Sequence, residues 1–294
     1  MDNFILILTK PDNVPIIGMI FLLAYYNWLA YTKAKANDAR EIPVEAEMTD
    51  KVHVWPYLVR QEFLMSILVL VILTVWSILI DAPLEEAANP SVTPNPSKAP
   101  WYFLGLQEML VYFDPWIAGV MLPTLIIIGM MAMPYIDINP KGNGYYTIKE
   151  RKFAIYTFVF GFAIWIALII VGTFLRGPGW NFFLPWQYWD PHKVVAANNV
   201  DFTELFGIHT RNIDNTLNVI AVLIGGILVM GYLVALPVWY WYKNKDKEVF
   251  KELGPVRYGV TAFLFVAMMG LPIKMMLRWF LNVKYVWVTS WFNV

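Results

Sequence analysis

Residues 153–175 read FAIYTFVFGFAIWIALIIVGTFL and contain no charged residue. A helix needs about 20 apolar residues to cross the hydrocarbon core of a bilayer, so this stretch predicts a membrane-spanning helix. The composition agrees, because 59% of the chain is hydrophobic and only 15% is charged, whereas about 25% of residues are charged in an ordinary soluble domain. We therefore expect an all-α, polytopic membrane protein.

Five further segments have the length and apolar character of a span. They are residues 15–32, 63–80, 116–133, 216–242 and 258–281, which gives six predicted spans in all. Pro123 is expected to kink the third span along the chain, because proline removes a helical hydrogen bond. Lys274 and Arg278 interrupt the last span, and each must reach the interface or find a partner.

The distribution of Lys and Arg predicts the orientation of the spans. The connections after the first, third and fifth spans carry most of these residues. Because cytoplasmic loops are enriched in Lys and Arg, we expect these connections inside and both termini outside. The N-terminal stretch MDNFILILTKPDN lacks a basic region and a small-residue cleavage site, so no signal peptide is expected. The prediction is a multi-pass protein of the bacterial inner membrane with periplasmic termini.

The composition also limits the chemistry of the chain. It contains no cysteine, which excludes disulfides, thiolate ligation of iron–sulfur clusters and covalently attached c-type haem. Basic and acidic residues number 22 each, so charge gives no reason to expect nucleic acid as a partner. His53, His192 and His209 all fall outside the spans, whereas bis-histidine haem ligation requires facing histidines within a bundle. We predict no haem and no metal ligated by this chain, so that any redox centre belongs to a partner.

Two long outer connections are rich in aromatic residues. The stretch SKAPWYFLGLQEML (97–110) follows several prolines and is too apolar for a loop in water. We expect something apolar to dock there, either a neighbouring protein, the lipid interface or a small hydrophobic ligand. The stretch RGPGWNFFLPWQYWDPHK (176–193) is predicted to form an interfacial aromatic belt, because Trp and Tyr are enriched at the headgroup level.

Carboxylates accompany the aromatic residues of the first outer connection. Glu85 and Glu86 are interpreted as acids that solvate the loop. Glu108 and Asp114 are predicted to lie nearly two turns apart on a short helix that begins near Tyr102 and follows the membrane surface. A carboxylate that accepts a proton and swings toward water is a sensible partner for a docked quinol, which loses protons on oxidation.

Several stretches together resemble a known family. They are VWPYLVRQEFLMSILVL (54–70), APWYFLGLQEML (99–110), PYIDINP (134–140) and the span from residue 153. In this order they are similar to the C-terminal domain of cytochrome b, which is a separate subunit IV in plastid and cyanobacterial complexes. The resemblance implies a domain over 51–179 that holds three of the six spans. Residues 1–50 are then an N-terminal helix with its linker, and residues 180–294 an outer loop with two additional helices.

The most specific element of the resemblance is a Pro-Glu-Trp-Tyr signature at the family's quinol-oxidation pocket. Here it reads Ala99, Pro100, Trp101 and Tyr102. The resemblance implies a quinol pocket lined by Pro100, Trp101, Tyr102 and Phe103, with the signature proline and glutamate replaced.

The missing glutamate has two implications. Another carboxylate must accept the quinol proton, with Glu108 as the first candidate and Asp114 as the second. Variation at this signature accompanies low-potential quinones in the family, so the resemblance implies menaquinol rather than ubiquinol.

The implied function is that of a membrane subunit in a quinol:cytochrome c oxidoreductase of the cytochrome bc type, catalytic only within its complex. Electrons would pass from quinol to a Rieske iron–sulfur protein and to haem b in a separate cytochrome b N-terminal subunit, with protons released outside. A c-type cytochrome and a dimeric complex are implied as well. The alternative is a structural anchor of a multihaem cytochrome membrane complex with a degenerate quinol pocket. A transporter ranks last, because only Lys274 approaches mid-membrane.

Overall fold

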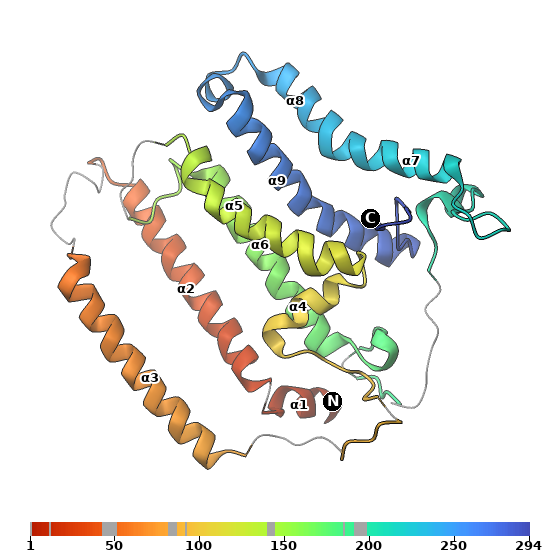
Figure 1. Cartoon of the computed structure of the whole chain (residues 1–294). Coiled ribbons are helices and arrows are strands. Elements are labelled where there is room, and N and C mark those ends of the chain that lie inside the picture. Colours follow the sequence, from red (N-terminus) through yellow and green to blue (C-terminus); the bar gives the residue numbers. More distant parts are fainter. Residues whose placement is uncertain are drawn as a thin grey trace. The chain divides into compact units, whose positions relative to one another are not determined.

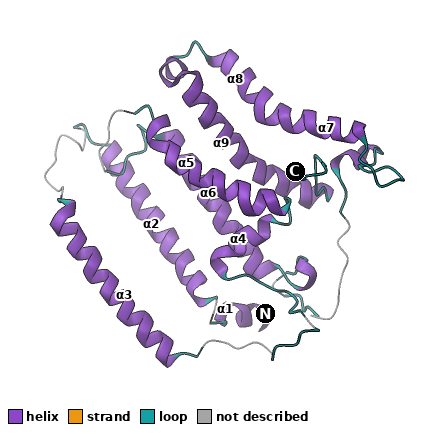
Figure 2. Ribbon diagram, viewed as in Figure 1, coloured by secondary structure: helices purple, strands orange, loops and turns teal. Residues whose placement is uncertain are grey.

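The computed structural model describes residues 2–11, 13–42, 52–81, 87–91, 93–139, 145–184, 186–190 and 199–294. Within these ranges the regular structure is helical, with isolated β-bridges in the connections (Figure 2). Six helices are long and apolar enough to cross a membrane, which confirms the predicted fold class. They are Val14–Asp38, Val54–Leu79, Ile117–Ile136, Lys152–Leu175, Val219–Asn244 and Glu248–Leu281.

The chain divides into two compact units, which are described separately. The first comprises Met1–Thr93 and Lys141–Lys152, and the second Pro94–Pro140 and Phe153–Val294. The first unit contains α1 (Asp2–Thr9), α2 (Val14–Asp38), the π turn η3 (Val54–Leu58) and α3 (Val59–Leu79), of which the three α-helices are labelled in Figure 1.

Helix α2 is defined at both ends by local chemistry. Pro15 occupies the first turn, where its missing N–H costs no helical hydrogen bond. At the other end, the Asp38 carboxylate accepts hydrogen bonds from the backbone N–H groups of Ile148 (3.0 Å) and Lys149 (3.2 Å). The predicted inner connection is thus tied to the end of the first span.

Helix α3 has no buried side chain along its length. It is apolar on all sides, which is the composition of a helix surrounded by lipid or by other apolar helices.

The second unit contains the remaining elements (Figure 1). They are α4 (Trp101–Met109), η4 (Ile117–Met121), α5 (Leu122–Ile136), α6 (Lys152–Ile170), η5 (Val171–Leu175), η6 (Pro178–Trp180), η7 (Phe202–Phe206), α7 (Val219–Met230), η8 (Gly231–Ala235), α8 (Leu236–Asn244) and α9 (Glu248–Leu281). Helix α5 contacts α9, and α9 contacts α8. The core joins the segment after α4 to α6 and α9, through Met109, Tyr112, Phe113, Ile117, Ala118, Leu168 and Met275.

Wide π turns occur in three of the spans of this unit. The turn η4 ends two residues before Pro123, and η8 ends two residues before Pro237. Proline cannot donate the hydrogen bond that an α-helix requires at its position, and a wider turn accommodates that loss. The kink expected at Pro123 therefore coincides with a π turn. The third turn, η5, ends α6 at the candidate site.

Lys274 and Arg278 both have partners, as the sequence required. The Lys274 ammonium is buried and donates to the carbonyl oxygen of Lys284, with the Phe113 ring centroid 5.6 Å away. The Arg278 guanidinium donates to the side-chain oxygen of Asn199 at 2.6 Å. Both cations lie toward the C-terminal end of α9, where the helix dipole favours positive charge.

The last residues of the chain pack closely on α7. A Cβ atom at Gly225 would lie 2.6 Å from the carbonyl oxygen of Val286 and 2.9 Å from the Cα atom of Trp287. Only glycine permits this approach. The segment 283–294 is also bridged to the predicted outer connection, where Lys284 N–H donates to the Val200 carbonyl (2.9 Å).

Candidate functional site

Helix α4 begins directly after the proline-rich segment, and Pro100 is its N-cap residue. Its own Gln107 fixes the chain that leads into it. The Gln107 side chain accepts a hydrogen bond from Ala99 N–H and donates one to the Ser97 carbonyl, both at 2.8 Å. The start of the helix is thereby held in place by a residue nearly two turns further along it.

One face of α4 is buried and the other carries aromatic rings. Leu104, Gly105, Glu108 and Met109 are buried, at the spacing of a single helix face. A Cβ atom at Gly105 would lie 3.4 Å from Trp165 and Ile169 of α6, and Leu104 packs on Gly172 in η5.

The opposite face of α4 presents the rings that the sequence assigned to a ligand. Tyr102 and Phe103 are 52% and 53% exposed, and Trp101 is half-buried. The centroids of Trp101 and Tyr102 are 5.7 Å apart, and those of Tyr102 and Phe103 4.8 Å. The structure therefore brings these three predicted residues into one ring cluster at the start of α4, next to Pro100.

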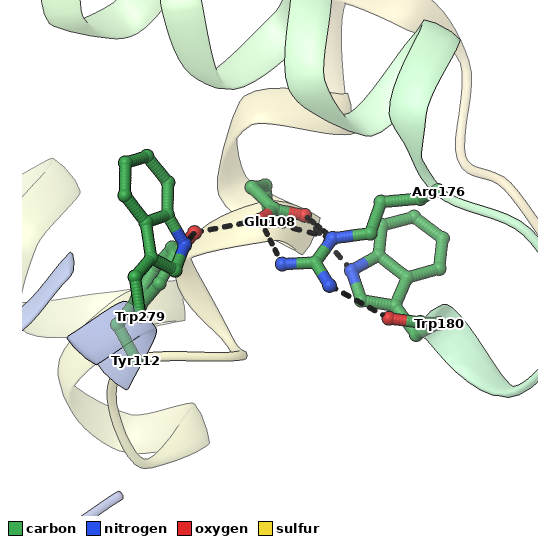
Figure 3. A network of polar contacts seen from close by, with 5 residues as sticks. All are labelled: Glu108, Tyr112, Arg176, Trp180 and Trp279. Atoms are coloured by element: carbon green, nitrogen blue, oxygen red, sulfur yellow. Dashed lines mark hydrogen bonds and ion pairs between the residues drawn. The ribbon is translucent and has the colours of Figure 1, made fainter. Parts of the chain in front are cut away.

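Glu108 is fully buried at the centre of a hydrogen-bond network (Figure 3). Its carboxylate accepts bonds from the Arg176 guanidinium, with Nε to Oε2 at 2.9 Å and Nη2 to Oε1. The Tyr112 hydroxyl donates to Oε1 and the Trp180 indole N–H to Oε2, each at 2.9 Å. The Arg176 Nε atom also lies 3.2 Å from Oε1. Each carboxylate oxygen therefore accepts at least two hydrogen bonds. The buried charge is thus paired and solvated by the protein, as low-dielectric surroundings require.

The loop after η5 is folded so that Arg176 faces Glu108. Arg176 and Phe182 form an antiparallel bridge, and the guanidinium carbon lies 3.9 Å from the Phe182 ring centroid. The same guanidinium donates to the Trp180 carbonyl at 2.9 Å. Gly179 turns the loop with a φ of 64°, a left-handed conformation that glycine adopts without strain.

Tyr112 links this ion pair to the last helix. Its hydroxyl accepts a hydrogen bond from the Trp279 indole N–H at 3.2 Å, while it donates to Glu108. Burial, and then the negative charge of Glu108, raise the pKa of the Tyr112 phenol above its usual range. Tyr112 therefore stays protonated and remains a hydrogen-bond donor to the carboxylate.

The structure places the second predicted carboxylate elsewhere. Helix α4 ends at Met109, so the prediction that Asp114 lies on the same short helix was wrong. Asp114 instead precedes the next span, where its Oδ1 accepts from Trp116 N–H (3.1 Å) and its Oδ2 from the Asn293 amide (3.3 Å). After Met109 the chain leaves the helix through turns at residues 110–112 and a bend at 113.

Sequence reasoning missed four members of the network. Arg176 entered only the prediction of membrane orientation, as one of the basic residues on the outer side. Trp180 was assigned to the interfacial belt, and Tyr112 and Trp279 were given no role. The signal available was an arginine and a glutamate at the edges of apolar segments on the same predicted side of the membrane. Of the other belt residues, Trp186 and Tyr188 are exposed, as a belt requires.

In the described part of the chain, the histidines and acidic residues do not gather into a candidate metal site. His53 and His209 are exposed. Among the described residues, no group of three or more His, Cys, Asp or Glu could hold a metal ion. Glu85, Glu86 and His192 lie outside the described residues.

Part of the chain matches a known protein family. Residues 87–193 match the family described as cytochrome b(C-terminal)/b6/petD. This segment includes α4, two of the candidate spans and the Glu108–Arg176 pair, whereas α3 and α9 lie outside it. No solved structure shows a significant match to the chain. Over residues 87–193 the chain is therefore similar to the cytochrome b C-terminal/b6/petD family, and it has six candidate membrane helices among its described residues.

Proposed function

We propose that this chain is a membrane subunit of a bc-type quinol:cytochrome c oxidoreductase and that α4 forms one wall of its outer quinol-oxidation site. The observation that carries the proposal is the position of the ring cluster Trp101, Tyr102 and Phe103, of which Tyr102 and Phe103 are exposed, inside the family-matched segment. Flat aromatic surfaces suit a planar quinol head group, and ligand sites are mostly apolar with a few polar groups. Redox chemistry is supplied by haem b and an iron–sulfur cluster in partner subunits.

The partners follow from the same family. A cytochrome b N-terminal subunit holds the haem, a Rieske protein takes the other electron, and a c-type cytochrome is the acceptor, in a dimeric complex. Within this arrangement the present chain orients the quinol, excludes water and provides a route for protons to the outer side. The departures at Ala99 and Pro100 favour menaquinol as the substrate. Faster turnover with ubiquinol than with menaquinol in the purified complex would contradict that choice.

Of the two candidate proton acceptors, the contacts favour Asp114 over Glu108. A carboxylate offers about four lone-pair positions, and those of Glu108 are occupied by Arg176, Tyr112 and Trp180. Among the described residues, each Asp114 carboxylate oxygen accepts a single bond. We propose that Asp114 takes the proton and that Glu108 holds α4 in place. Asp114→Asn should then slow quinol oxidation about 10²-fold or more, the usual cost of a lost general base. Unchanged turnover would return the role to Glu108.

The proposed quinol site on α4 is tested by removing the ring of Tyr102, the middle residue of the ring cluster. Tyr102→Ala in the assembled complex should lower quinol-dependent cytochrome reduction about tenfold or more, because a ligand that loses its positioning surface reacts poorly. The control is Tyr146→Ala. Tyr146 is 57% exposed, close to the 52% of Tyr102, but lies on the predicted inner connection. Haem content and subunit composition should match wild type in both variants. Unchanged turnover and unchanged KM for quinol in Tyr102→Ala would reject the site.

One observation favours the alternative of a structural anchor. Glu108 is held by several donors at once, which is the arrangement of a structural ion pair. An anchor predicts that Tyr102→Ala leaves turnover unchanged and that Arg176→Met disrupts subunit assembly.

A further inference from the structure

We infer that Trp279, on helix α9 and outside the family-matched segment, is a positioning residue for the candidate site. It supports Glu108 through Tyr112 and Arg176 through Phe182, and so holds helix α4 in its orientation. The last helix is then part of the site, although the family match ends long before it.

The first contact orients a hydrogen bond. The Trp279 indole can only donate, and it donates to the Tyr112 hydroxyl oxygen at 3.2 Å. A phenol has one hydrogen, and with its oxygen accepting from Trp279 that hydrogen points to Glu108 at 2.9 Å. Trp279 thus selects the hydroxyl rotamer that stabilises the carboxylate. The two rings also pack edge to face, with centroids 6.4 Å apart at 70°.

The second contact supports the other side of the ion pair. The Phe182 ring lies edge-on to Trp279, with centroids 6.2 Å apart at 75°. The Arg176 guanidinium rests on the same Phe182 ring at 3.9 Å. Edge-to-face aromatic pairs and cation–π contacts are both directional. Trp279 therefore touches the two residues that flank the Glu108–Arg176 pair, as Figure 3 shows for Tyr112.

The Glu108–Arg176 contact also determines the orientation of the exposed rings of α4. Glu108 is the only charged side chain of this helix, and its bonds to Arg176 attach α4 to the end of α6. Loosening that attachment lets the helix, and with it Tyr102 and Phe103, change orientation. Because Trp279 is itself 47% exposed, it can be replaced without opening a closed core.

The test compares Trp279→Phe, Tyr112→Phe and the double variant in the purified complex. Trp279→Phe removes the indole N–H and keeps an aromatic ring. The control is Trp291→Phe, at a residue that is 86% exposed. One readout is hydrogen exchange of residues 101–109, which does not depend on activity. The other is the steady-state KM and kcat for quinol, and this part of the inference rests on the proposed function.

We expect each single variant to speed exchange of residues 101–109 about two- to tenfold, the factor that one hydrogen bond is worth. The double variant should add nothing further, because the indole N–H acts through Tyr112, whereas the ring that contacts Phe182 is retained as phenylalanine. KM for quinol should rise about threefold or more with kcat within about twofold, as expected when a binding surface is misplaced. Trp291→Phe should change neither readout.

The outcomes separate the two proposals. Faster exchange with an unchanged KM supports the positioning role of Trp279 and counts against a quinol site on α4. Unchanged exchange in Trp279→Phe and also in Trp279→Leu, which removes the ring, overturns the inference whatever the kinetics. Additive effects in the double variant overturn the route through Tyr112.

Discussion

Glu108 and Arg176 form an ion pair whose members are 0% and 4% exposed. A buried ion pair adds little net stability, because desolvating the charges offsets their attraction, but losing one partner is costly. What the pair provides here is a fixed contact between α4 and the end of α6.

Removing one partner should be far more damaging than removing both. Arg176→Met leaves a buried carboxylate without its cation and should lower stability by about 3–5 kcal/mol. Adding Glu108→Leu removes the stranded charge and should restore much of the loss. Thermal unfolding of the purified complex measures both. Arg211→Met is the matched control, since Arg211 is exposed and bonds only locally to Asn215. A double variant as unstable as the single one would contradict the argument.

Of the two residues in this ion pair, only Glu108 could be singled out from the sequence. Glu108 stood out as an acid on an apolar segment. Its cation lies 68 positions away along the chain, with two predicted spans between them, and no periodicity connects positions so distant. The bond from the Trp180 indole to Glu108 was equally unpredictable. A tryptophan of an interfacial belt and a tryptophan that folds inward occur in stretches of the same aromatic composition.

Among the elements, α7 and the segment 283–294 depend on a single small residue. The approach of Val286 to Gly225 leaves no room for a side chain. The predicted span over 216–242 is correct to within a few residues at its start and end, yet the tail that packs on it has no periodic signal. Its position follows from tertiary contacts alone.

Gly225→Ala should therefore release the tail from α7. Overpacking of this kind costs about 1–3 kcal/mol, and limited proteolysis should cut within 283–294 faster than in wild type. Gly231→Ala is the control, because nothing lies within 4 Å of a Cβ atom there. Equal cleavage rates for the two variants would show that the contact with Val286 is unimportant.

The stability of the turn η7, which lies in the predicted outer connection, should depend on pH. Asp201 accepts from the Thr210 hydroxyl at 2.9 Å, and partial burial raises the pKa of its carboxyl above the usual value. Folding therefore favours the protonated form. That contribution is complete below the unfolded pKa, near 3.9, and is lost as pH rises through the folded pKa. The Tm of Asp201→Asn relative to wild type should therefore rise as the pH increases from about 4. The exposed Asp214→Asn serves as a control for charge, and a pH-independent Tm difference in Asp201→Asn would contradict this assignment.

For the whole molecule, span number and fold class were predictable because membrane helices need long apolar runs, and these are visible in any sequence window. The orientation stays a prediction from the distribution of Lys and Arg. The domain boundaries at 50, 51, 179 and 180 also stay predictions, and the family match over 87–193 offers a narrower alternative.

The absence of cysteine makes the orientation simple to measure. Ser97→Cys should react with a membrane-impermeant maleimide in cells whose outer membrane alone is opened. Lys245→Cys should react only after the inner membrane is disrupted. Both side chains are exposed, so accessibility within the fold is matched. The reverse pattern would place the aromatic rings of α4 on the cytoplasmic side and remove the basis for an outer quinol site.

The π turn η5 makes chain length matter as much as residue identity. Each residue of an α-helix advances about 100° around the axis, and a π turn contains one residue more than an α turn. If the same number of residues formed ordinary α turns, Arg176 would lie about one residue position further around the axis, and its guanidinium would point away from α4. The wide turn therefore compensates for one extra residue, and a natural variant one residue shorter between Gly172 and Arg176 would direct the same arginine to its glutamate through an ordinary α turn.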